Sequence, residues 1–353
     1  MGVQIQTVAS CTGYVFVSTG SVYHKSQEPT GNWTPFEPTD PDHTWPGVSL
    51  PMSAATYQNP EGLVGYVAVA GVDGQLYIGA PARGVSGPLV VPPLPPMQPY
   101  SVLATDSYIM YFSSDSAQIA LIDFAQIMGI VPSTNSVYQV LQAPGSYQSP
   151  GPLTAAKDSE GLWEICGTLG TGLEIVRLVG EPASVRWSHI PLDVEGWPFG
   201  LYLCGEALYM FLTDSEQIWV KRALRLKLPR QRDAEYLWEA AHLLPSPPQG
   251  TFDLQPATII VAPGEYFMLF TIDGDGGLWR LQYGGTSDSN TWEYVGFPTE
   301  ADSIRPSTLA VSIGTTGNVE LFAASDAGDL WQMWHTTETG VWSDWYFHGR
   351  PAD

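Results

Sequence analysis

Side chains able to do chemistry gather close to the C-terminus. Four tryptophans and two histidines follow one another at short spacing: Trp331, Trp334, His335, Trp342, Trp345 and His348. Indole faces stack on rings and on C–H surfaces, and an imidazole exchanges a proton near neutral pH. His335 is therefore the candidate general acid or base. Side chains alternate along a strand, so Trp331 and Trp334 are expected on opposite faces of it.

A similar but weaker pattern precedes this one. The segment Gly-Gly-Leu-Trp-Arg-Leu-Gln-Tyr spans residues 276–283. The candidate ligand-binding residues of both segments are Trp279, Arg280, Tyr283, Trp331, Trp334, Trp342, Trp345 and His348. For each single tryptophan, packing in a sheet core is the competing interpretation, because aromatic residues commonly fill such cores.

No metal or cofactor site is expected. Cys11, Cys166 and Cys204 lie in or beside apolar, strand-like runs and lack metal-ligand spacing. We interpret them as buried thiols, with one incidental disulfide as the alternative. The segment Asp273–Gly277 has the look of a calcium loop but lacks the remaining ligands, and a hairpin turn explains it better. The sequence has no Gly-rich phosphate loop and no serine nucleophile elbow.

Short strands must position the C-terminal aromatic residues. Residues 319–323, 330–335 and 341–347 are rich in β-branched, aliphatic and aromatic residues, which favours three strands. Residues 325–329 and 338–340 contain the Ser, Asp, Thr and Gly typical of turns.

The rest of the chain repeats this unit. A turn followed by a strand start recurs at Val22-Tyr23, Leu76-Tyr77, Ile119-Ala120, Leu173-Glu174, Ile218-Trp219, Leu278-Trp279 and Leu330-Trp331. The mean step is about 51 residues, which suits a four-stranded propeller blade. An aromatic start of a further strand has the same period, at Trp33, Tyr138, Trp187, Trp238, Trp292 and Trp342; the second repeat has Leu89-Val90 there.

Each repeat also contains two earlier strands. The first consists of small apolar residues, at 3–10, 52–58, 100–105, 153–156, 199–204, 257–262 and 308–313. The second spans residues 14–18, 64–70, 108–113, 162–168, 208–213, 266–272 and 319–323. The sequence thus predicts an all-β, single-domain, seven-bladed propeller of four-stranded antiparallel blades, with a six-bladed propeller as the alternative. The expected blades are residues 1–46, 47–97, 98–147, 148–195, 196–250, 251–302 and 303–353.

Charge narrows the classes of partner. A net charge of −22 with only 14 Lys and Arg disfavours nucleic acid and anionic membranes. No apolar run reaches membrane-spanning length. The N-terminus shows no signal-peptide pattern, so we expect that such a segment was removed or never existed, and the localisation stays open.

The two C-terminal repeats resemble those of propeller lectins. The segments Gly-Gly-Leu-Trp-Arg-Leu-Gln-Tyr and Gly-Asp-Leu-Trp-Gln-Met-Trp-His are similar to the repeats of seven-bladed bacterial and fungal lectins with Leu-Trp-His-x-Trp-Gln motifs. Fungal fucose-specific lectins are similar more distantly. The resemblance implies sites between neighbouring blades, where Trp stacks on a sugar and an Arg or Glu bonds to its hydroxyls.

The other repeats depart from the lectin pattern. The aromatic slot holds Ile119-Ala120 in the third repeat and Leu173-Glu174 in the fourth. This divergence favours one specialised pocket, as in the fungal hetero-Diels–Alderases that resemble lectin-like propellers. The leading hypothesis is therefore a cofactor-free biosynthetic cyclase joining a tropolone- or phenol-derived quinone methide to a terpene alkene. The alternative is a carbohydrate-binding, fucose-type lectin with aromatic sites near blades six and seven, and a third hypothesis is a purely structural or partner-binding propeller. Either way the partner is a small molecule, and a homodimer is left open.

Overall fold

The computed structural model divides the chain into two compact units. Unit 1 comprises residues 1–142 and 298–353, and unit 2 comprises residues 143–297. The structure describes residues 4–8, 14–19, 21–28, 32–42, 45, 52–59, 62–71, 73, 75–83, 85–88, 99–106, 108–113, 118–124, 138–142, 154–157, 163–169, 172–179, 184–190, 193–194, 196–204, 206–214, 216–226, 235–246, 258–262, 266–273, 277–284, 291–296, 306–314, 316–336 and 338–351.

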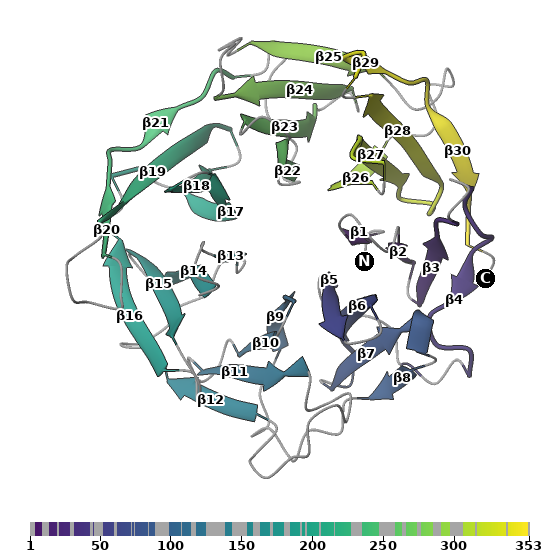
Figure 1. Ribbon diagram of the computed structural model, residues 1–353, viewed down its shortest axis with the longest axis horizontal. Helices are drawn as coiled ribbons and strands as arrows, with labels where there is room; N and C mark the ends of the chain where they lie inside the picture. The colour runs from purple at the N-terminus through teal and green to yellow at the C-terminus, as the bar shows by residue number, and fades with distance from the viewer. Residues whose placement is uncertain are drawn as a thin grey trace. The chain divides into compact units, whose positions relative to one another are not determined.

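Unit 1 contains four antiparallel sheets (Figure 1). Sheet 1 is built from β1 (Gln4–Val8), β2 (Tyr14–Ser18), β3 (Val22–Ser26) and β4 (Glu37–Pro38). Sheet 2 is built from β5 (Ser53–Asn59), β6 (Gly62–Ala70), β7 (Leu76–Ala80) and β8 (Val85–Pro88), with the 3-10 helix η1 (Pro81–Arg83) before β8. Sheet 3 is built from β9 (Pro99–Ala104), β10 (Tyr108–Ser113), β11 (Gln118–Asp123) and β12 (Tyr138–Gln142). Sheet 7 is built from β26 (Pro306–Ile313), β27 (Val319–Ser325), β28 (Leu330–Thr336), β29 (Val341–Trp342) and β30 (Tyr346–Gly349).

Unit 2 contains three sheets of the same kind. Sheet 4 is built from β13 (Thr154–Lys157), β14 (Trp163–Leu169), β15 (Gly172–Val179) and β16 (Ser184–Ile190). Sheet 5 is built from β17 (Trp197–Cys204), β18 (Ala207–Thr213), β19 (Ile218–Leu226), β20 (Glu235–Trp238) and β21 (His242–Leu243). Sheet 6 is built from β22 (Thr258–Ala262), β23 (Tyr266–Ile272), β24 (Leu278–Tyr283) and β25 (Trp292–Gly296).

Every sheet is a meander. The first four strands of each sheet pair in chain order, and the fifth strands of sheets 5 and 7, β21 and β30, pair with the third strand of their sheets. The predicted repeat unit is thereby confirmed as a four-stranded antiparallel sheet, the building block of a propeller blade. The first strands begin within about two residues of their predicted starts, because their small apolar residues mark them clearly.

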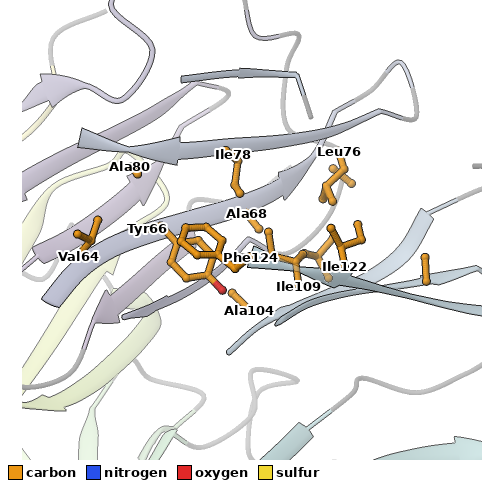
Figure 2. Packing of buried hydrophobic residues seen from close by; sticks show 13 residues of the cluster. Val64, Tyr66, Ala68, Leu76, Ile78, Ala80, Ala104, Ile109, Ile122 and Phe124 are labelled. Atoms are coloured by element: carbon orange, nitrogen blue, oxygen red, sulfur yellow. The ribbon is translucent and has the colours of Figure 1, made fainter. Parts of the chain in front are cut away.

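The core is built between neighbouring sheets. Figure 2 shows buried side chains of sheets 2 and 3 gathered in one cluster, where Tyr66 stacks on Phe124 at a ring-centroid distance of 4.0 Å. Ile78, Ile109 and Ile122 belong to the same cluster. Burying such side chains supplies the main stabilising term of the fold.

Sheets 1 and 7, the first and last along the chain, also pack together. Val15 and Val17 of β2 share a buried cluster with Phe322 and Ala324 of β27. The buried Lys25 on β3 donates from Nζ to the carbonyl oxygen of His348 on β30, at 3.1 Å. Each of these sheets consists of one continuous stretch of chain, so their junction depends on side-chain packing.

The last predicted strand is interrupted. Residues 341–347 were expected to form one strand, but the structure has β29 and β30 with a break at Ser343–Trp345. The hydroxyl oxygen of Ser343 accepts from the backbone N–H of Trp334 at 3.0 Å, which takes a donor from the ladder. The chain therefore re-enters the sheet at β30, where Tyr346 lies opposite Gln332.

Trp33 does not begin a regular strand, contrary to the sequence prediction. It forms an isolated bridge with Gln27, and the fourth strand of sheet 1 comes later, at β4. The hydroxyl oxygen of Thr34 accepts from the backbone N–H of Ser26 at 3.0 Å, which holds this irregular turn. In sheet 2 the fourth strand described is β8, and the predicted strand at Leu89-Val90 lies outside the described residues.

Candidate functional site

A cavity of about 500 Å³ opens where sheets 1 and 7 meet, and we call it the seam cavity. Sheet 1 and the turn after β3 contribute Gln27, Asn32 and Trp33. Sheet 7 contributes Thr316, Asn318, Glu320, Gln332, Trp334 and Tyr346. The lining thus combines three aromatic side chains with hydroxyl, amide and carboxyl groups, which is the usual composition of a small-ligand site.

Strand register brings the sheet 7 residues to one face. Glu320 on β27 lies directly opposite Trp334 on β28, and Gln332 lies opposite Tyr346 on β30. Gln332 and Trp334 are two residues apart on one strand, so their side chains point the same way. Phe322, two residues from Glu320, continues this face into the core shared with sheet 1.

Trp33 is held against this face by aromatic contacts. Its ring meets Phe322 edge-on at a centroid distance of 5.7 Å and His348 edge-on at 5.4 Å. Tyr346 meets His348 in the same manner at 4.9 Å. Edge-to-face pairs of this kind favour a fixed ring orientation. The two aromatic walls of the cavity are therefore joined through the histidine.

His348 orients Gln332. Its Nε2–H donates to Oε1 of Gln332 at 2.9 Å, which leaves the amide N–H groups of Gln332 as donors beside the cavity. Burial, together with the charge of nearby Lys25, lowers the pKa of His348 to about 3. The imidazole is therefore neutral at physiological pH and acts as a positioning group.

Glu320 is the acidic group of the cavity. Its side chain is 6% exposed, and burial raises its pKa to about 7. The carboxyl group lies directly against Gly314, where any side chain would collide with it. Among the described residues, no hydrogen bond or ion pair reaches this carboxylate. A buried acid without a partner is costly to ionise, so it favours a ligand that supplies the partner.

Two of the predicted residues belong to this site. Trp334 lines the cavity, and His348 lies behind it in contact with Trp33, Tyr346 and Gln332. The other predicted aromatic residues of sheet 7 lie elsewhere. Trp331 is buried beside Phe347, at a centroid distance of 5.6 Å.

The candidate general acid or base also lies apart from the cavity. His335 is buried and its ring lies 5.1 Å from that of Trp342. Residues 331 and 335 are separated from Trp334 by odd numbers of positions, so strand alternation directs them to the opposite face. Trp345 is partly buried in the break between β29 and β30. Roles for these residues in binding or catalysis stay predictions.

Sheet 6 uses its predicted residues in packing. Trp279 is 7% exposed, belongs to a buried cluster and donates from Nε1 to Asp273 at 2.7 Å. Tyr283 packs on the same cluster, and Arg280 forms an ion pair with Glu293. None of these three residues lines the seam cavity, whose lining belongs to unit 1.

Within the described residues, no group of three or more His, Cys, Asp or Glu side chains could hold a metal ion, and no helix is long and apolar enough to cross a membrane. Cys204 is a free thiol that is partly buried. The side chains of Cys11 and Cys166 lie outside the described residues.

Sequence reasoning missed several members of the site. Glu320 stands in an apolar strand, Gln332 stands between Trp331 and a methionine, and Tyr346 follows the unforeseen strand break. Trp33 was noted only as a strand start. A Glu within an otherwise apolar strand, two residues before a core Phe, is the signal that could have been used.

Comparisons with solved structures identify a shared fold. The BP39L lectin from Burkholderia pseudomallei matches with a TM-score of 0.65 and 15% identity, over 98% of this chain and 98% of the lectin. A puromycin-hydrolysing peptidase from Mycobacterium tuberculosis matches with a TM-score of 0.55 and 12% identity, over 98% of this chain but only 53% of the peptidase. The fucose-specific lectin of Aleuria aurantia, a six-bladed β-propeller, matches with a TM-score of 0.49 and 12% identity, over 99% of this chain and 97% of the lectin.

No protein-family model matches the chain, and no curated protein is similar to it in sequence. The chain is an all-β propeller with lectin-like structural neighbours, as predicted. The two matches with TM-scores above 0.5, at identities of 15% and 12%, establish the fold alone. The comparisons give no support to the hetero-Diels–Alderase branch, and the structures that they match include a lectin.

Proposed function

We propose that the chain is a carbohydrate-binding protein of the lectin type, built as a seven-bladed propeller with one monosaccharide site at the seam cavity. The observation that carries this proposal is the composition of that cavity. Trp33, Trp334 and Tyr346 offer aromatic faces, while Glu320 and Gln332 offer an acceptor and a donor. Sugars present C–H faces between hydroxyl groups, so they are recognised by this combination.

The size and place of the cavity also suit a sugar. A volume of about 500 Å³ accommodates a monosaccharide with its hydration, and the cavity lies between two sheets. The resemblance of the C-terminal repeats to those of lectins implies sites at such junctions. The likeness to the BP39L lectin extends this support to nearly the whole length of both chains.

One site, rather than one per repeat, is expected because sheet 6 does not repeat the lining of sheet 7. The register of sheet 6 places Met268, Arg280 and Gln282 where sheet 7 has Glu320, Gln332 and Trp334. Met268 is buried and Gln282 has no aromatic face. The seven sheets of the described residues correspond to the seven blades in this proposal.

Binding of a monosaccharide panel, followed by intrinsic tryptophan fluorescence, tests the proposal. The panel contains methyl α-L-fucoside, D-glucose, D-galactose, D-mannose and their amino and N-acetylamino derivatives. We expect at least one sugar to bind, and Trp334→Ala to weaken it about tenfold or more through loss of the stacking face. Gln282→Ala, the register equivalent in sheet 6, is the matched control and should bind as the parent does. Unchanged binding by Trp334→Ala would remove the seam cavity as the site.

A further inference from the structure

The seam cavity contains a carboxyl group that the protein itself leaves without a charge partner. Glu320 is almost fully buried on β27, and it is one of the residues that line the cavity. Among the described residues, neither a basic side chain nor a hydrogen-bond donor reaches it. Burial raises the pKa of Glu320 to about 7, which is the expected response of an acid desolvated without compensation.

The nearby cations are already engaged. Lys25 on β3 donates to the carbonyl oxygen of His348, and its ammonium group also lies 4.7 Å from the ring centroid of Phe36. Arg350 forms two hydrogen bonds with Asp329, at 2.7 and 3.1 Å. His348 is neutral, because burial and Lys25 lower its pKa to about 3. A positive charge for Glu320 is therefore best supplied by a ligand.

The aromatic walls favour the same charge. Trp33, Trp334 and Tyr346 approach the cavity from both sheets, and the faces of such rings attract ammonium groups. An acidic group among several aromatic rings is a suitable environment for a cation that has lost part of its water. A sugar with only hydroxyl groups has no positive charge and would not make these interactions with the carboxyl group and the rings.

We propose that the seam cavity prefers monosaccharides that carry a free amino group over their hydroxyl analogues, with the Glu320 carboxylate holding the ammonium group. The inference rests on the proposed function and specifies its ligand class. In this arrangement Gln332 donates to a hydroxyl oxygen of the sugar, and the aromatic side chains cover the ring. Acidic sugars are disfavoured, because they would place a second negative charge beside Glu320.

Matched ligand pairs test the preference by calorimetric titration of the full chain at pH 7. The pairs are D-glucosamine with D-glucose and D-galactosamine with D-galactose; N-acetyl-D-glucosamine keeps the nitrogen but removes its charge. The amino member of at least one pair should bind about tenfold more tightly or better. Glu320→Gln should bring that ratio close to one. Glu293→Gln, which changes an exposed carboxylate of sheet 6, should leave the ratio unchanged.

The pH dependence supplies a second readout. Affinity for the amino sugar should rise between pH 5 and 7 as Glu320 loses its proton, and Glu320→Gln should abolish that rise. His348, the buried histidine in contact with the aromatic lining, stays neutral over this range, because burial and Lys25 lower its pKa to about 3. The affinity for D-glucose should show no such rise.

The outcomes separate this inference from the proposed function. Equal binding of amino and hydroxyl members, or binding of methyl α-L-fucoside alone, overturns the amine preference and leaves the carbohydrate site intact. Failure of every sugar in the panel to bind overturns both. An amine preference that survives in Glu320→Gln overturns the role of Glu320.

Discussion

Sheets 6 and 7 share a register but use it differently. Their central hairpins align residue for residue, so Trp279 corresponds to Trp331, and both indoles are buried. Three positions further along the aligned strands the sheets diverge. Sheet 7 has Trp334 opposite Glu320, whereas sheet 6 has Gln282 opposite Met268.

The difference separates two roles that the same residue type plays. A tryptophan at the first position fills the core, and a tryptophan at the second lines a cavity. The similar Leu-Trp patterns of the two sheets therefore indicate only that each sheet is a blade. The residue opposite the second position, which is charged in sheet 7 and apolar in sheet 6, indicates whether a site is present. Sheet 7 alone, of these two, combines an acidic residue with an aromatic face at that level.

The largest expected effect separates the two tryptophan positions. Trp279→Ala should lower the free energy of unfolding by about 3–5 kcal/mol, because it empties a buried site and removes the partner of Asp273. Trp334→Ala should cost clearly less, since its side chain is only partly buried, yet it should abolish most sugar binding. Urea unfolding and titration of both variants check this. Equal stability losses would contradict the division of roles.

The next effect concerns pH and Glu320. Its folded pKa of about 7 lies above the ordinary value of 4.5, so folding binds a proton between these values. The associated stability is present below pH 4.5 and is lost as the pH rises through 7. The free energy of unfolding of Glu320→Gln, relative to that of the parent, should therefore rise by up to about 3 kcal/mol between pH 4 and pH 8. Urea unfolding at the two pH values measures it, and Met268→Leu should show no comparable change. If the difference in free energy of unfolding between Glu320→Gln and the parent were the same at both pH values, the raised pKa of a desolvated Glu320 carboxyl group would be refuted.

A smaller effect is expected at Gly314. A methyl group there would collide with the Glu320 carboxyl, so Gly314→Ala should cost about 1–3 kcal/mol and weaken sugar binding by displacing the acid. The control in sheet 6 is Gly284→Ala. Gly284 has a φ of +80° and open space around it, so alanine there should cost about 1 kcal/mol with no effect on binding. Binding that is equally affected by both variants would show that Gly314 has no special relation to Glu320.

The smallest effect is expected at Arg280. Its ion pair with Glu293 lies at the surface, so Arg280→Ala should cost about 1 kcal/mol or less and leave sugar binding unchanged. Gln332→Ala, the equivalent change in sheet 7, should weaken binding several-fold through loss of an amide donor. Titration of the two variants under the same conditions compares them. Loss of sugar binding in Arg280→Ala would indicate that sheet 6 takes part in the binding site.

The sequence predicted the repeated sheets well because strands and turns are local signals. Alternating apolar residues and Asp- or Gly-containing turns set most strand limits to within a few residues. The predicted strand limits were wrong where a side-chain hydroxyl group took the place of a backbone hydrogen-bond partner. Ser343 interrupts the last strand, and Thr34 holds the irregular turn at Trp33. A single hydroxyl decides both cases, and composition does not reveal which hydroxyl will do so.

The site was predicted less completely, for a different reason. Trp334 and His348 stood out by type, but one wall of the cavity, formed by Gln27, Asn32 and Trp33, comes from the other end of the chain. Spacing within a repeat cannot show that Trp33 meets His348, because only packing between sheets creates that contact. His335 stood out equally and lies on the opposite face.

The stoichiometry of sugar binding tests the central claim most directly. Calorimetric titration of the full chain with the tightest sugar of the panel, repeated with Trp334→Ala, gives both the number of sites and their location. One site per chain that is lost in Trp334→Ala is the predicted result. Several equivalent sites, or a single site that persists in Trp334→Ala, would contradict the assignment of function to the seam cavity.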